Sequence, residues 1–396
     1  MAIALAFSGG LDTSFCVPYL REKYDKDVFT VTVDTGASLD QTILSTLSRK
    51  LGAVKHVHID ARESLYEHYL KFLIIGNVLR GGVYPLCVGA ERVVQAREVV
   101  RVAHEVGADA IAHGSTGAGN DQVRFDSVVH LLADGMQLIT PIRDEGLTRQ
   151  DTTKFLLDRG FEVSEKTTSY SINEGLWGTT IGGKETLGTT EPLPDEAYPN
   201  TASPKHAPEA GIDITIQFKN GLPIALDGEN LPPVELIIRL ATIGADHGIG
   251  RNIHIGDTIL GLKGRIGFEA PAPLILITAH RELEKLVLSK WQRYQKDQLS
   301  DFYGMLVHEG QYYDPVMRDI EALMISSQEV VTGSVAIRLY KGNINVLGAE
   351  SPYSMFDTGV AIYGEESALW NGRDARSFCK LNGLQGYLAH KARTKT

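Results

Sequence analysis

The sequence contains few cysteines and no long run of apolar residues. Its three cysteines, Cys16, Cys87 and Cys379, are widely scattered, which excludes a disulfide framework and the Cys/His spacings of zinc sites. The chain starts with a short apolar segment that has no basic leader, and no segment stays apolar over the roughly 20 residues that span a bilayer. We therefore expect a cytoplasmic protein with no membrane partner.

Basic residues are also in short supply. Lys and Arg number 39 against 49 Asp and Glu, which gives a formal net charge of −10. Neutralising nucleic-acid phosphates requires a basic face, so this balance argues against a nucleic-acid partner and favours a small-molecule substrate. Hydrophobic residues make up 43% of the 396 residues, which is enough for buried cores in two domains.

Apolar strands alternate with amphipathic helices over the first 165 residues. The pattern predicts strands at 3–7, 28–33, 56–59 and 108–113 and helices at 13–24, 41–51 and 91–106. We expect Ser38 to cap the second of these helices. Such alternation is typical of an α/β domain with a doubly wound parallel sheet, whose ligand lies beyond the carboxyl ends of the strands.

The rest of the chain has a different composition. Residues 182–210 are rich in Gly, Pro, Thr and acidic residues, which indicates a linker and not a packed element. Strands are predicted at 212–218, 223–226, 330–339 and 343–347, with a helix at 234–243. This mixture predicts a second, α+β domain. The chain then ends in a short helix and a basic tail from Lys391 to Lys395.

A glycine-rich segment follows the first predicted strand, where residues 8–14 read Ser-Gly-Gly-Leu-Asp-Thr-Ser. Two glycines let the backbone approach an anion, hydroxyl groups can donate to phosphate oxygens, and the next helix adds its positive N-terminal dipole. No lysine follows, unlike in loops that bind the β- and γ-phosphates for terminal transfer. The alternative is an ordinary tight turn, but the complete string favours a pyrophosphate-binding loop.

This string resembles the signature of the PP-loop class of ATP pyrophosphatases. Residues 113–125, His-Gly-Ser-Thr-Gly-Ala-Gly-Asn-Asp-Gln-Val-Arg-Phe, resemble the aspartate- and nucleotide-binding segment of argininosuccinate synthetases. Similarity to that family continues at 170–178, 247–251, 278–284, 331–333 and 351–354. The resemblance therefore covers nearly the whole chain. It predicts a nucleotide-binding domain at 1–165, a substrate-binding and oligomerisation domain at 166–374, and a C-terminal helix and tail at 375–396.

The resemblance implies a ligase that uses ATP and Mg²⁺ and forms AMP and pyrophosphate. An oxygen of a ureido or carbamoyl acceptor would take AMP from ATP, and the amino group of L-aspartate would then displace AMP. Because a ureido carbon is a poor electrophile, adenylation supplies the leaving group, and positioning with electrostatics supplies most of the catalysis. The resemblance also implies a homotetramer with exchanged C-terminal tails.

The resemblance also assigns residues to the site. Catalytic roles fall to Asp12, Asn120, Asp121 and Arg124. ATP binding falls to Ala6, Ser8, Gly9, Gly10, Asp12, Thr13, Ser14, Val33, Gly114 and Gly117. Substrate binding falls to Tyr84, Val88, Gly89, Thr116, Asn120, Asp121, Arg124, Ser171, Thr180, Gly256 and Phe268. Taken singly, an Asn-Asp turn or a surface Arg pair is ordinary; taken as a string, these residues favour a site.

The chain departs from the family where the family grips the amino-acid end of citrulline. Val88 and Gly89 replace a Thr-Ser or Thr-Ala pair, Gly256 replaces a glutamate and Phe268 a tyrosine, while Thr180 replaces a serine. A lost carboxylate removes a charge-assisted contact of about 1.5–3 kcal/mol. Our hypothesis is that ATP and aspartate are retained and that the carbonyl acceptor is another ureido, carbamoyl or amide compound.

Alternatives remain open. The chain is a genuine argininosuccinate synthetase using citrulline if Asp257 or Glu91 compensates for the missing carboxylate. A tRNA-modifying PP-loop enzyme would need reactive cysteines and a basic surface, and a glutamine amidotransferase would need an N-terminal cysteine or a glutaminase domain. A non-catalytic nucleotide-binding relative is less favoured, because the phosphate loop and the Asn-Asp-Gln-Val-Arg string are complete.

Overall fold

The computed structural model describes residues 2–38, 40–163, 170–365 and 367–394. The chain forms two compact units, Met1–Pro352 and Tyr353–Thr396. The predicted domain boundary between residues 165 and 166 lies outside the described residues, and the three-domain division stays a prediction. The three cysteines carry free thiols, of which only that of Cys379 is exposed.

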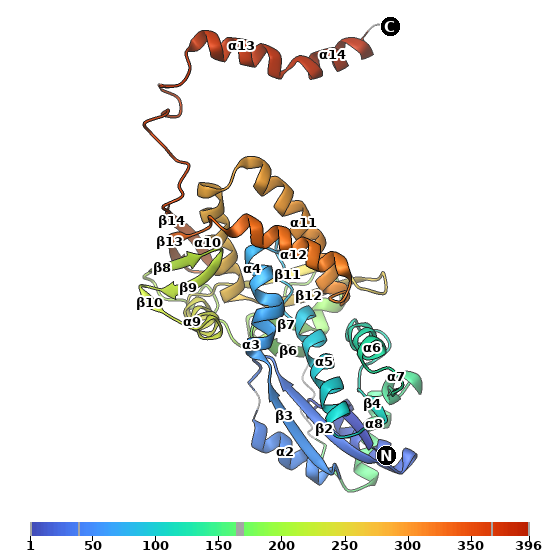
Figure 1. The fold of residues 1–396 in the computed structure, drawn as a ribbon. Helices are drawn as coiled ribbons and strands as arrows, with labels where there is room; N and C mark the ends of the chain where they lie inside the picture. The colour runs from blue at the N-terminus through green and yellow to red at the C-terminus, as the bar shows by residue number, and fades with distance from the viewer. Residues whose placement is uncertain (1, 39, 164–169, 366, 395–396) are drawn as a thin grey trace. The chain divides into compact units, whose positions relative to one another are not determined.

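The elements follow one another in the order shown in Figure 1. The strands are β1 (Ala2–Ala6), β2 (Asp27–Asp34), β3 (Lys55–Asp60), β4 (Ala110–Ala112), β5 (Gln137–Ile139), β6 (Ser171–Gly175), β7 (Gly178–Gly182), β8 (Ile212–Lys219), β9 (Leu222–Leu226), β10 (Glu229–Asn230), β11 (Arg251–Asp257), β12 (Lys263–Glu269), β13 (Gly333–Tyr340) and β14 (Asn343–Glu350). The α-helices are α1 (Leu11–Tyr24), α2 (Gln41–Lys50), α3 (Arg62–Leu65), α4 (Lys71–Ile75), α5 (Gly89–Glu105), α6 (Asp121–Leu132), α7 (Pro141–Asp144), α8 (Arg149–Asp158), α9 (Pro233–Asp246), α10 (Pro271–Val287), α11 (Lys290–Glu309), α12 (Pro315–Gln328), α13 (Gly372–Asn382) and α14 (Leu384–Arg393). A π-helical turn η1 (Tyr66–Leu70) joins α3 to α4, and two short 3-10 helices, η2 (Lys184–Leu187) and η3 (Asp195–Ala197), follow β7.

The first part of the larger unit is built on a five-stranded sheet in the order β3-β2-β1-β4-β5. All neighbouring strands in it are parallel, and Ile3 of β1 is in register with Val28 of β2 and Ala110 of β4. The predicted doubly wound α/β fold is therefore confirmed. The strand order reverses between β1 and β4, and in folds of this kind ligands bind beyond the strand ends at that point.

Both faces of this sheet are covered, as the alternation of side chains along β1 shows. Ala2 and Ala4 point to the core that contains the valines of α5, whereas Ile3 and Leu5 point to the core that contains Phe15 of α1. Because successive side chains of a strand point to opposite faces, an entirely apolar β1 is explained by a sheet buried on both sides. Helices α1 and α5 both contact β1 and β2.

Two local predictions in this domain are wrong. Helix α2 is capped by Asp40, whose side chain accepts a hydrogen bond of 3.0 Å from the backbone N–H of Ile43, and not by Ser38. Asp40 is the residue directly before the helix, and only from there can a carboxylate reach the free N–H groups of the first turn. Strand β4 is also shorter than predicted, since it pairs only over Ala110–Ala112.

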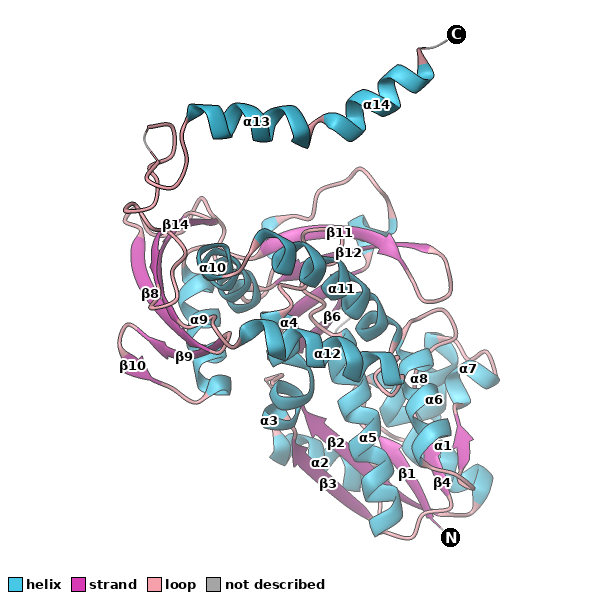
Figure 2. Cartoon of the chain, turned by 45° about the horizontal axis from the view of Figure 1, so that its top comes forward, coloured by secondary structure: helices cyan, strands magenta, loops and turns pink. Residues whose placement is uncertain are grey.

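The second part of the larger unit consists of two antiparallel sheets packed with helices (Figure 2). The orders are β10-β9-β8-β13-β14 and β11-β12-β7-β6. The predicted α+β character is confirmed. The segment 182–210, however, is not a bare linker: Leu193 and Ala197 are buried and pack with Ile181 in a small core of their own.

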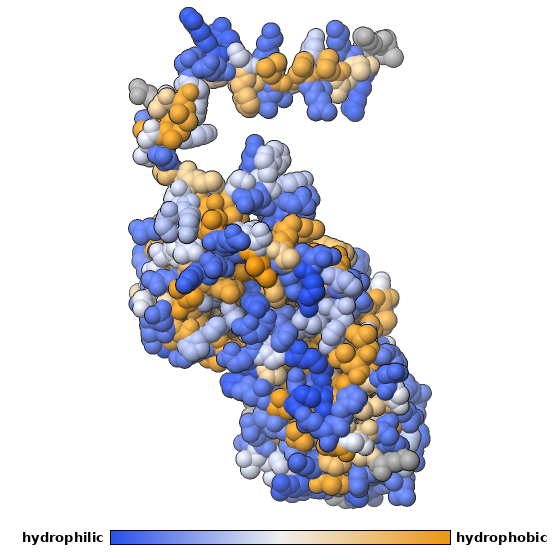
Figure 3. Space-filling view, in the orientation of Figure 1, coloured by the Kyte–Doolittle hydropathy of each residue, from blue (hydrophilic) through white to orange (hydrophobic). Residues whose placement is uncertain are grey.

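The unit Tyr353–Thr396 contains α13 and α14. Lys391 and Arg393, which were predicted to lie in a basic tail after a short helix, lie within the helix α14, and Lys395 lies outside the described residues. Large side chains on these two helices are exposed, namely Phe378, Leu381, Leu384, Tyr387 and Leu388. Figure 3 shows orange, hydrophobic atoms along the two helices. None of the helices in the described ranges combines the length and the apolar character needed to cross a bilayer.

Candidate functional site

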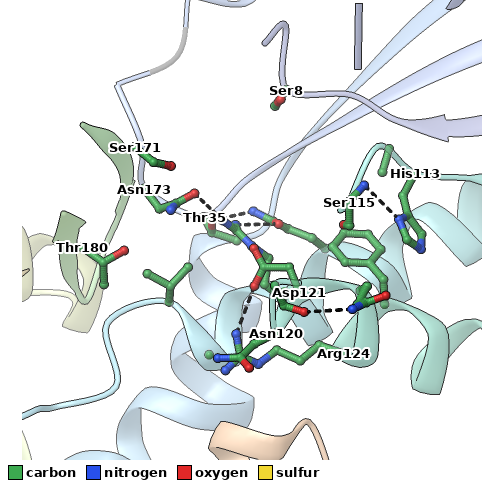
Figure 4. A pocket seen from close by; sticks show the side chains of 18 of the residues that line it. Ser8, Thr35, His113, Ser115, Asn120, Asp121, Arg124, Ser171, Asn173 and Thr180 are labelled. Carbon is green, nitrogen blue, oxygen red and sulfur yellow. Dashed lines mark hydrogen bonds and ion pairs between the residues drawn. The ribbon is translucent and has the colours of Figure 1, made fainter. Parts of the chain in front are cut away.

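A cavity of about 660 Å³ lies at the carboxyl ends of β1 and β4, within the unit Met1–Pro352. It is lined by Ala6 at the end of β1, by Phe7 and Ser8 directly after it, and by His113 and Gly114 after β4. This is the point at which the strand order reverses, so the cavity lies where the fold predicts a ligand. Figure 4 shows Ser8 on one side of the cavity and Asn120, Asp121 and Arg124 on the other.

The glycine-rich segment forms a loop that ends in a helix N-terminus. Gly9 has a φ of +75°, which a residue without a Cβ adopts without strain. Thr13 holds the loop: its Oγ1 accepts from the Ser8 N–H at 3.3 Å and donates to the Gly10 carbonyl at 3.3 Å. Gly10 is the N-cap of α1 and no side chain caps the helix. The first N–H groups of α1 therefore remain available to an anion.

The loop after β4 approaches this phosphate loop closely. A Cβ at Gly114 would lie 3.3 Å from the carbonyl carbon of Asp12 and 3.3 Å from the backbone nitrogen of Thr13. His113 is held by both ring nitrogens: Nδ1 accepts from the Ser115 N–H at 3.3 Å, so Nε2 carries the proton that it donates to Asp126 at 2.8 Å. The imidazole thus fixes the loop in place.

Asp121, the first residue of α6, lies between two arginines. Its Oδ2 accepts from Arg92 Nε at 2.9 Å and its Oδ1 from Arg124 Nη1 at 3.0 Å. Arg92 also donates to Asn173 of β6 at 2.8 Å, which continues the chain of contacts drawn in Figure 4. Burial raises the pKa of Asp121, but the charges of Arg92 and Arg124 outweigh it and hold that pKa below its ordinary value. Asp121 is therefore a carboxylate at neutral pH.

Other contacts fix the segment from Gly117 to Asn120. The side-chain amide of Gln122 donates to the carbonyl groups of Gly117 and Gly119. The Asn120 Oδ1 accepts from the Ile259 N–H at 2.9 Å, which ties the start of α6 to the connection between β11 and β12. This hydrogen bond joins residues that are more than 130 positions apart in the sequence at one wall of the cavity.

The cavity is also lined by residues of β6, β7 and β11 and of the N-terminal part of α5. Tyr84 lies there with its ring stacked on that of His254, with centroids 5.2 Å apart, and tilted against that of Phe268 at the same separation. Arg80 and His308 line the same region. Arg124 donates to the carbonyl of His308 through Nε at 2.9 Å, which joins this region to Asp121.

The structure brings most of the predicted site residues together. Those that line the cavity are Ala6, Ser8, Gly10, Asp12, Thr13, Val33, Tyr84, Val88, Gly89, Gly114, Thr116, Asn120, Asp121, Arg124, Ser171, Thr180 and Gly256. Gly9, Ser14, Gly117 and Phe268 do not line it. Sequence reasoning missed lining residues too, among them Arg80, Arg92, His254 and His308.

The two acidic residues considered as replacements for the missing carboxylate are both engaged elsewhere. Asp257 lines the cavity, but its carboxylate pairs with Lys263, which lowers its pKa. Glu91 does not line the cavity and is 1% exposed. Burial raises the pKa of Glu91 to about 8, and the neighbouring charge of Arg92 offsets only part of this shift. Glu91 is therefore protonated at neutral pH and offers no charge to a ligand ammonium.

The buried Glu91 should make the stability of the fold depend on pH. Its pKa lies above the ordinary value of 4.5, so the folded chain holds the proton more tightly than the unfolded chain. The stabilisation is then complete below about pH 4.5, falls as the pH rises to about 8, and is lost above that, by about 3–5 kcal/mol in total. Urea unfolding from pH 5 to pH 9 should show a slope that Glu91→Gln flattens. An equal slope in both proteins would assign the effect to other groups.

Comparison with known proteins gives a consistent result over nearly the whole chain. The model for the arginosuccinate synthase N-terminal HUP domain matches residues 2–162, and that for the arginosuccinate synthase C-terminal domain matches residues 170–389. An argininosuccinate synthase of Methanocaldococcus jannaschii is 38% identical over 97% of this chain and 96% of its own length. Those of Pyrobaculum aerophilum and Xanthomonas campestris pv. campestris are 39% and 40% identical, covering 99% and 98% of this chain and 98% and 97% of their own lengths.

Proposed function

Since the chain belongs to the argininosuccinate synthase family, we propose that its cavity adenylates a ureido or carbamoyl acceptor and couples that acceptor to L-aspartate. The chain is an ATP-dependent ligase that forms carbon–nitrogen bonds. The observation that carries the proposal is the meeting of the phosphate loop with Asn120 and Asp121 in one cavity. A single site can then hold ATP, aspartate and the acceptor at once, as two successive displacements require.

The phosphate loop binds the nucleotide. Ser8, Gly10 and Thr13 line the cavity beside the uncapped N-terminus of α1, which favours negative charge. Ala6 and Val33, at the ends of β1 and β2, offer an apolar surface to the base and ribose. The loop lacks the lysine of sites that transfer a terminal phosphoryl group, so pyrophosphate leaves as a unit and AMP moves to the acceptor.

Mg²⁺ fits the site as an ion bound mainly by phosphate oxygens. Among the described residues, no group of three or more His, Cys, Asp or Glu side chains could enclose a metal ion. One carboxylate, that of Asp12, lines the cavity beside the phosphate loop, and Mg²⁺ is commonly held by one or two carboxylates together with substrate phosphates. When bound there, Mg²⁺ would neutralise charge on the departing pyrophosphate.

Aspartate binds on the opposite wall. The Asp121 carboxylate attracts its ammonium, while Asn120 and Thr116 supply further polar contacts. The guanidinium groups of the partly buried Arg92 and the buried Arg124 hold Asp121 in one orientation from both sides. The negative charge of Asp121 is then fixed in space before the substrate arrives, which is the arrangement in which electrostatic stabilisation costs no reorganisation.

The reaction proceeds in two displacements. The acceptor oxygen attacks the α-phosphorus, and the bond to the β-phosphate oxygen breaks with its electrons, which releases pyrophosphate. The aspartate nitrogen, once deprotonated, attacks the activated carbon, and the carbon–oxygen bond breaks to release AMP. No side chain forms a covalent intermediate in this scheme.

The chain performs this reaction in the cytoplasm as a homotetramer, for which the exposed apolar side chains of α13 and α14 provide a surface.

The products of ATP distinguish this reaction from terminal phosphoryl transfer. With ATP, Mg²⁺, aspartate and a ureido acceptor, we expect AMP and pyrophosphate in equal amounts, each dependent on the acceptor. Separation of the nucleotides by anion-exchange chromatography, with an enzymatic assay for pyrophosphate, measures both. Formation of ADP, or nucleotide turnover that does not depend on the acceptor, would contradict the proposed function.

A further inference from the structure

The acceptor end of the cavity is lined by nitrogen-bearing side chains. Arg80, His254 and His308 come from three separate parts of the chain and all line the cavity together with Tyr84 and Gly256. Arg80 donates through Nη2 to the carbonyl of Asp257 at 2.8 Å, and in the described part of the chain it forms no ion pair. Together with Lys263, its charge lowers the pKa of the nearby Asp257 carboxyl, and its guanidinium lines the cavity, where a ligand can meet it.

Two buried histidines have an unused ring nitrogen. His254 and His308 are each 7% exposed, and the Nε2 atom of each has no hydrogen-bond partner. Buried polar atoms normally find partners, so two such atoms in the lining of one cavity indicate a ligand that supplies them. For His308 the tautomer follows from its other nitrogen: Nδ1 lies 3.3 Å from Arg124 Nη2, which can only donate, so Nε2 carries the hydrogen.

The imidazole of His254 also occupies the space beside Gly256. A Cβ at Gly256 would lie 2.4 Å from His254 Nε2. The family resemblance implies a glutamate at the position of Gly256, so a potential hydrogen-bond donor here would take the place of an acceptor. The Asp257 carboxylate in this region is paired with Lys263. Glu174 of β6 also lines the cavity, and its Oε1 accepts from Ser38 Oγ at 3.5 Å. Because the guanidinium of Arg80 and the Nε2–H of His308 are donors, this end favours a carboxylate over an ammonium.

We infer that the acceptor is a ureido acid whose far end carries a carboxylate and no free ammonium. The guanidinium of Arg80 and the Nε2–H of His308 are donors to that carboxylate, while Val88 and the ring of Tyr84 contact the methylene chain. This inference rests on the proposed function, since it names the acceptor of the same site. It also explains Gly256 and His254 together: Gly256 carries no acceptor for an ammonium, and the imidazole of His254 fills the space that a side chain at Gly256 would need.

Four matched ureas test the inference. Citrulline carries a carboxylate and an ammonium, 5-ureidopentanoate only the carboxylate, 4-ureidobutylamine only the ammonium, and butylurea neither. Calorimetric titration in the presence of a non-hydrolysable ATP analogue should show that 5-ureidopentanoate binds about 10- to 100-fold more tightly than butylurea and citrulline, with 4-ureidobutylamine the weakest. Tighter binding of citrulline, or equal binding of butylurea, would overturn the inference.

Turnover by the same four ureas separates the inference from the proposed function. Formation of AMP with any of them supports the adenylating reaction, whichever urea is preferred. The predicted order of binding without AMP formation would uphold the carboxylate site and refute the proposed reaction. AMP formation with citrulline preferred would uphold the reaction and refute the carboxylate site.

Variants assign the preference to named side chains. Arg80→Gln should reduce the advantage of 5-ureidopentanoate over butylurea by about tenfold and leave the binding of butylurea unchanged. The matched control is Arg239→Gln, because Arg239 is a partly exposed arginine paired with Glu229 outside the cavity. The double variant His254→Ala, Gly256→Glu should shift the preference toward citrulline. The assignment would be contradicted if Arg80→Gln left the affinity ratio of 5-ureidopentanoate to butylurea unchanged, or if the double variant did not shift its preference toward citrulline. If a variant fails to fold, the four ureas measured with the wild-type protein decide the inference.

Discussion

The variant Asp121→Asn is expected to lose about 10³-fold in kcat/KM for aspartate. The carboxamide cannot accept from both arginines, since one of its two polar atoms is a donor that would face a guanidinium group. One of the two contacts to arginine is therefore lost, and removal of the charge also removes the attraction for the substrate ammonium. At about 1.5–3 kcal/mol each, these two losses correspond to roughly two to four decades. Steady-state release of pyrophosphate at varied aspartate concentration measures the effect.

The matched control for this variant is Asp213→Asn. Asp213 also pairs with an arginine, Arg338, at 2.6 Å, but both side chains are half exposed and lie outside the cavity. The control should keep kcat/KM for aspartate within about twofold, since exposed pairs contribute about 0–1 kcal/mol. Thermal unfolding of both variants checks that the fold is retained. If Asp121→Asn kept kcat/KM within threefold of the wild type, Asp121 would have no part in the reaction.

The parallel sheet could be predicted because its signal is local. Strand β1 is apolar at every position, is followed by a glycine-rich bend, and leads into a helix. The apolar run that predicts the strand and the glycines that predict its end therefore lie within about 20 residues. The sheet of β6, β7, β11 and β12 could not be predicted in the same way. Strand β6 reads Ser-Ile-Asn-Glu-Gly and is held by pairing with β7, and β12 pairs with β7 across more than 80 residues.

Helix α10 shows a second reason for a missed element. It begins Pro-Ala-Pro, and prolines commonly indicate a break, although here they occupy the first turn, where no backbone N–H is needed. Lys296 of helix α11 is completely buried, although a lysine in a sequence normally predicts an exposed position. Its ammonium donates to the Ile75 carbonyl at 2.9 Å and lies 3.1 Å from Glu284, contacts that exist only after folding.

The same distinction applies to the site. The Gly-Asn-Asp-Gln-Val-Arg string could be assigned because its residues are contiguous and carry the family resemblance. Arg92, His254 and His308 are single positions on three elements, and tertiary folding alone brings them to the cavity. Arg92 did leave one signal in the sequence: it follows Glu91 within a helix of valines and alanines, where a charged pair on a buried face requires partners.

The close contact between the phosphate loop and the loop after β4 can be tested at Gly114. In Gly114→Val the new Cβ would lie 3.3 Å from the backbone of Asp12 and Thr13, and a branched side chain there forces the two loops apart, because backbone atoms cannot rotate away. A displacement of about 1 Å between the bound nucleotide and the opposite wall is enough to lower kcat/KM for ATP by about 10²-fold.

The control for Gly114→Val is Gly348→Val, since a Cβ at Gly348 meets no atom within 4 Å and this residue lies in β14, outside the cavity. Initial rates of AMP formation at varied ATP concentration should separate the two variants, with the control close to wild type. Which kinetic constant changes also identifies the cause of the lower kcat/KM. A rise in KM for ATP with kcat retained would mean that the loops serve binding alone, whereas a fall in kcat would show that their separation sets the distance over which the acceptor oxygen reaches the α-phosphorus.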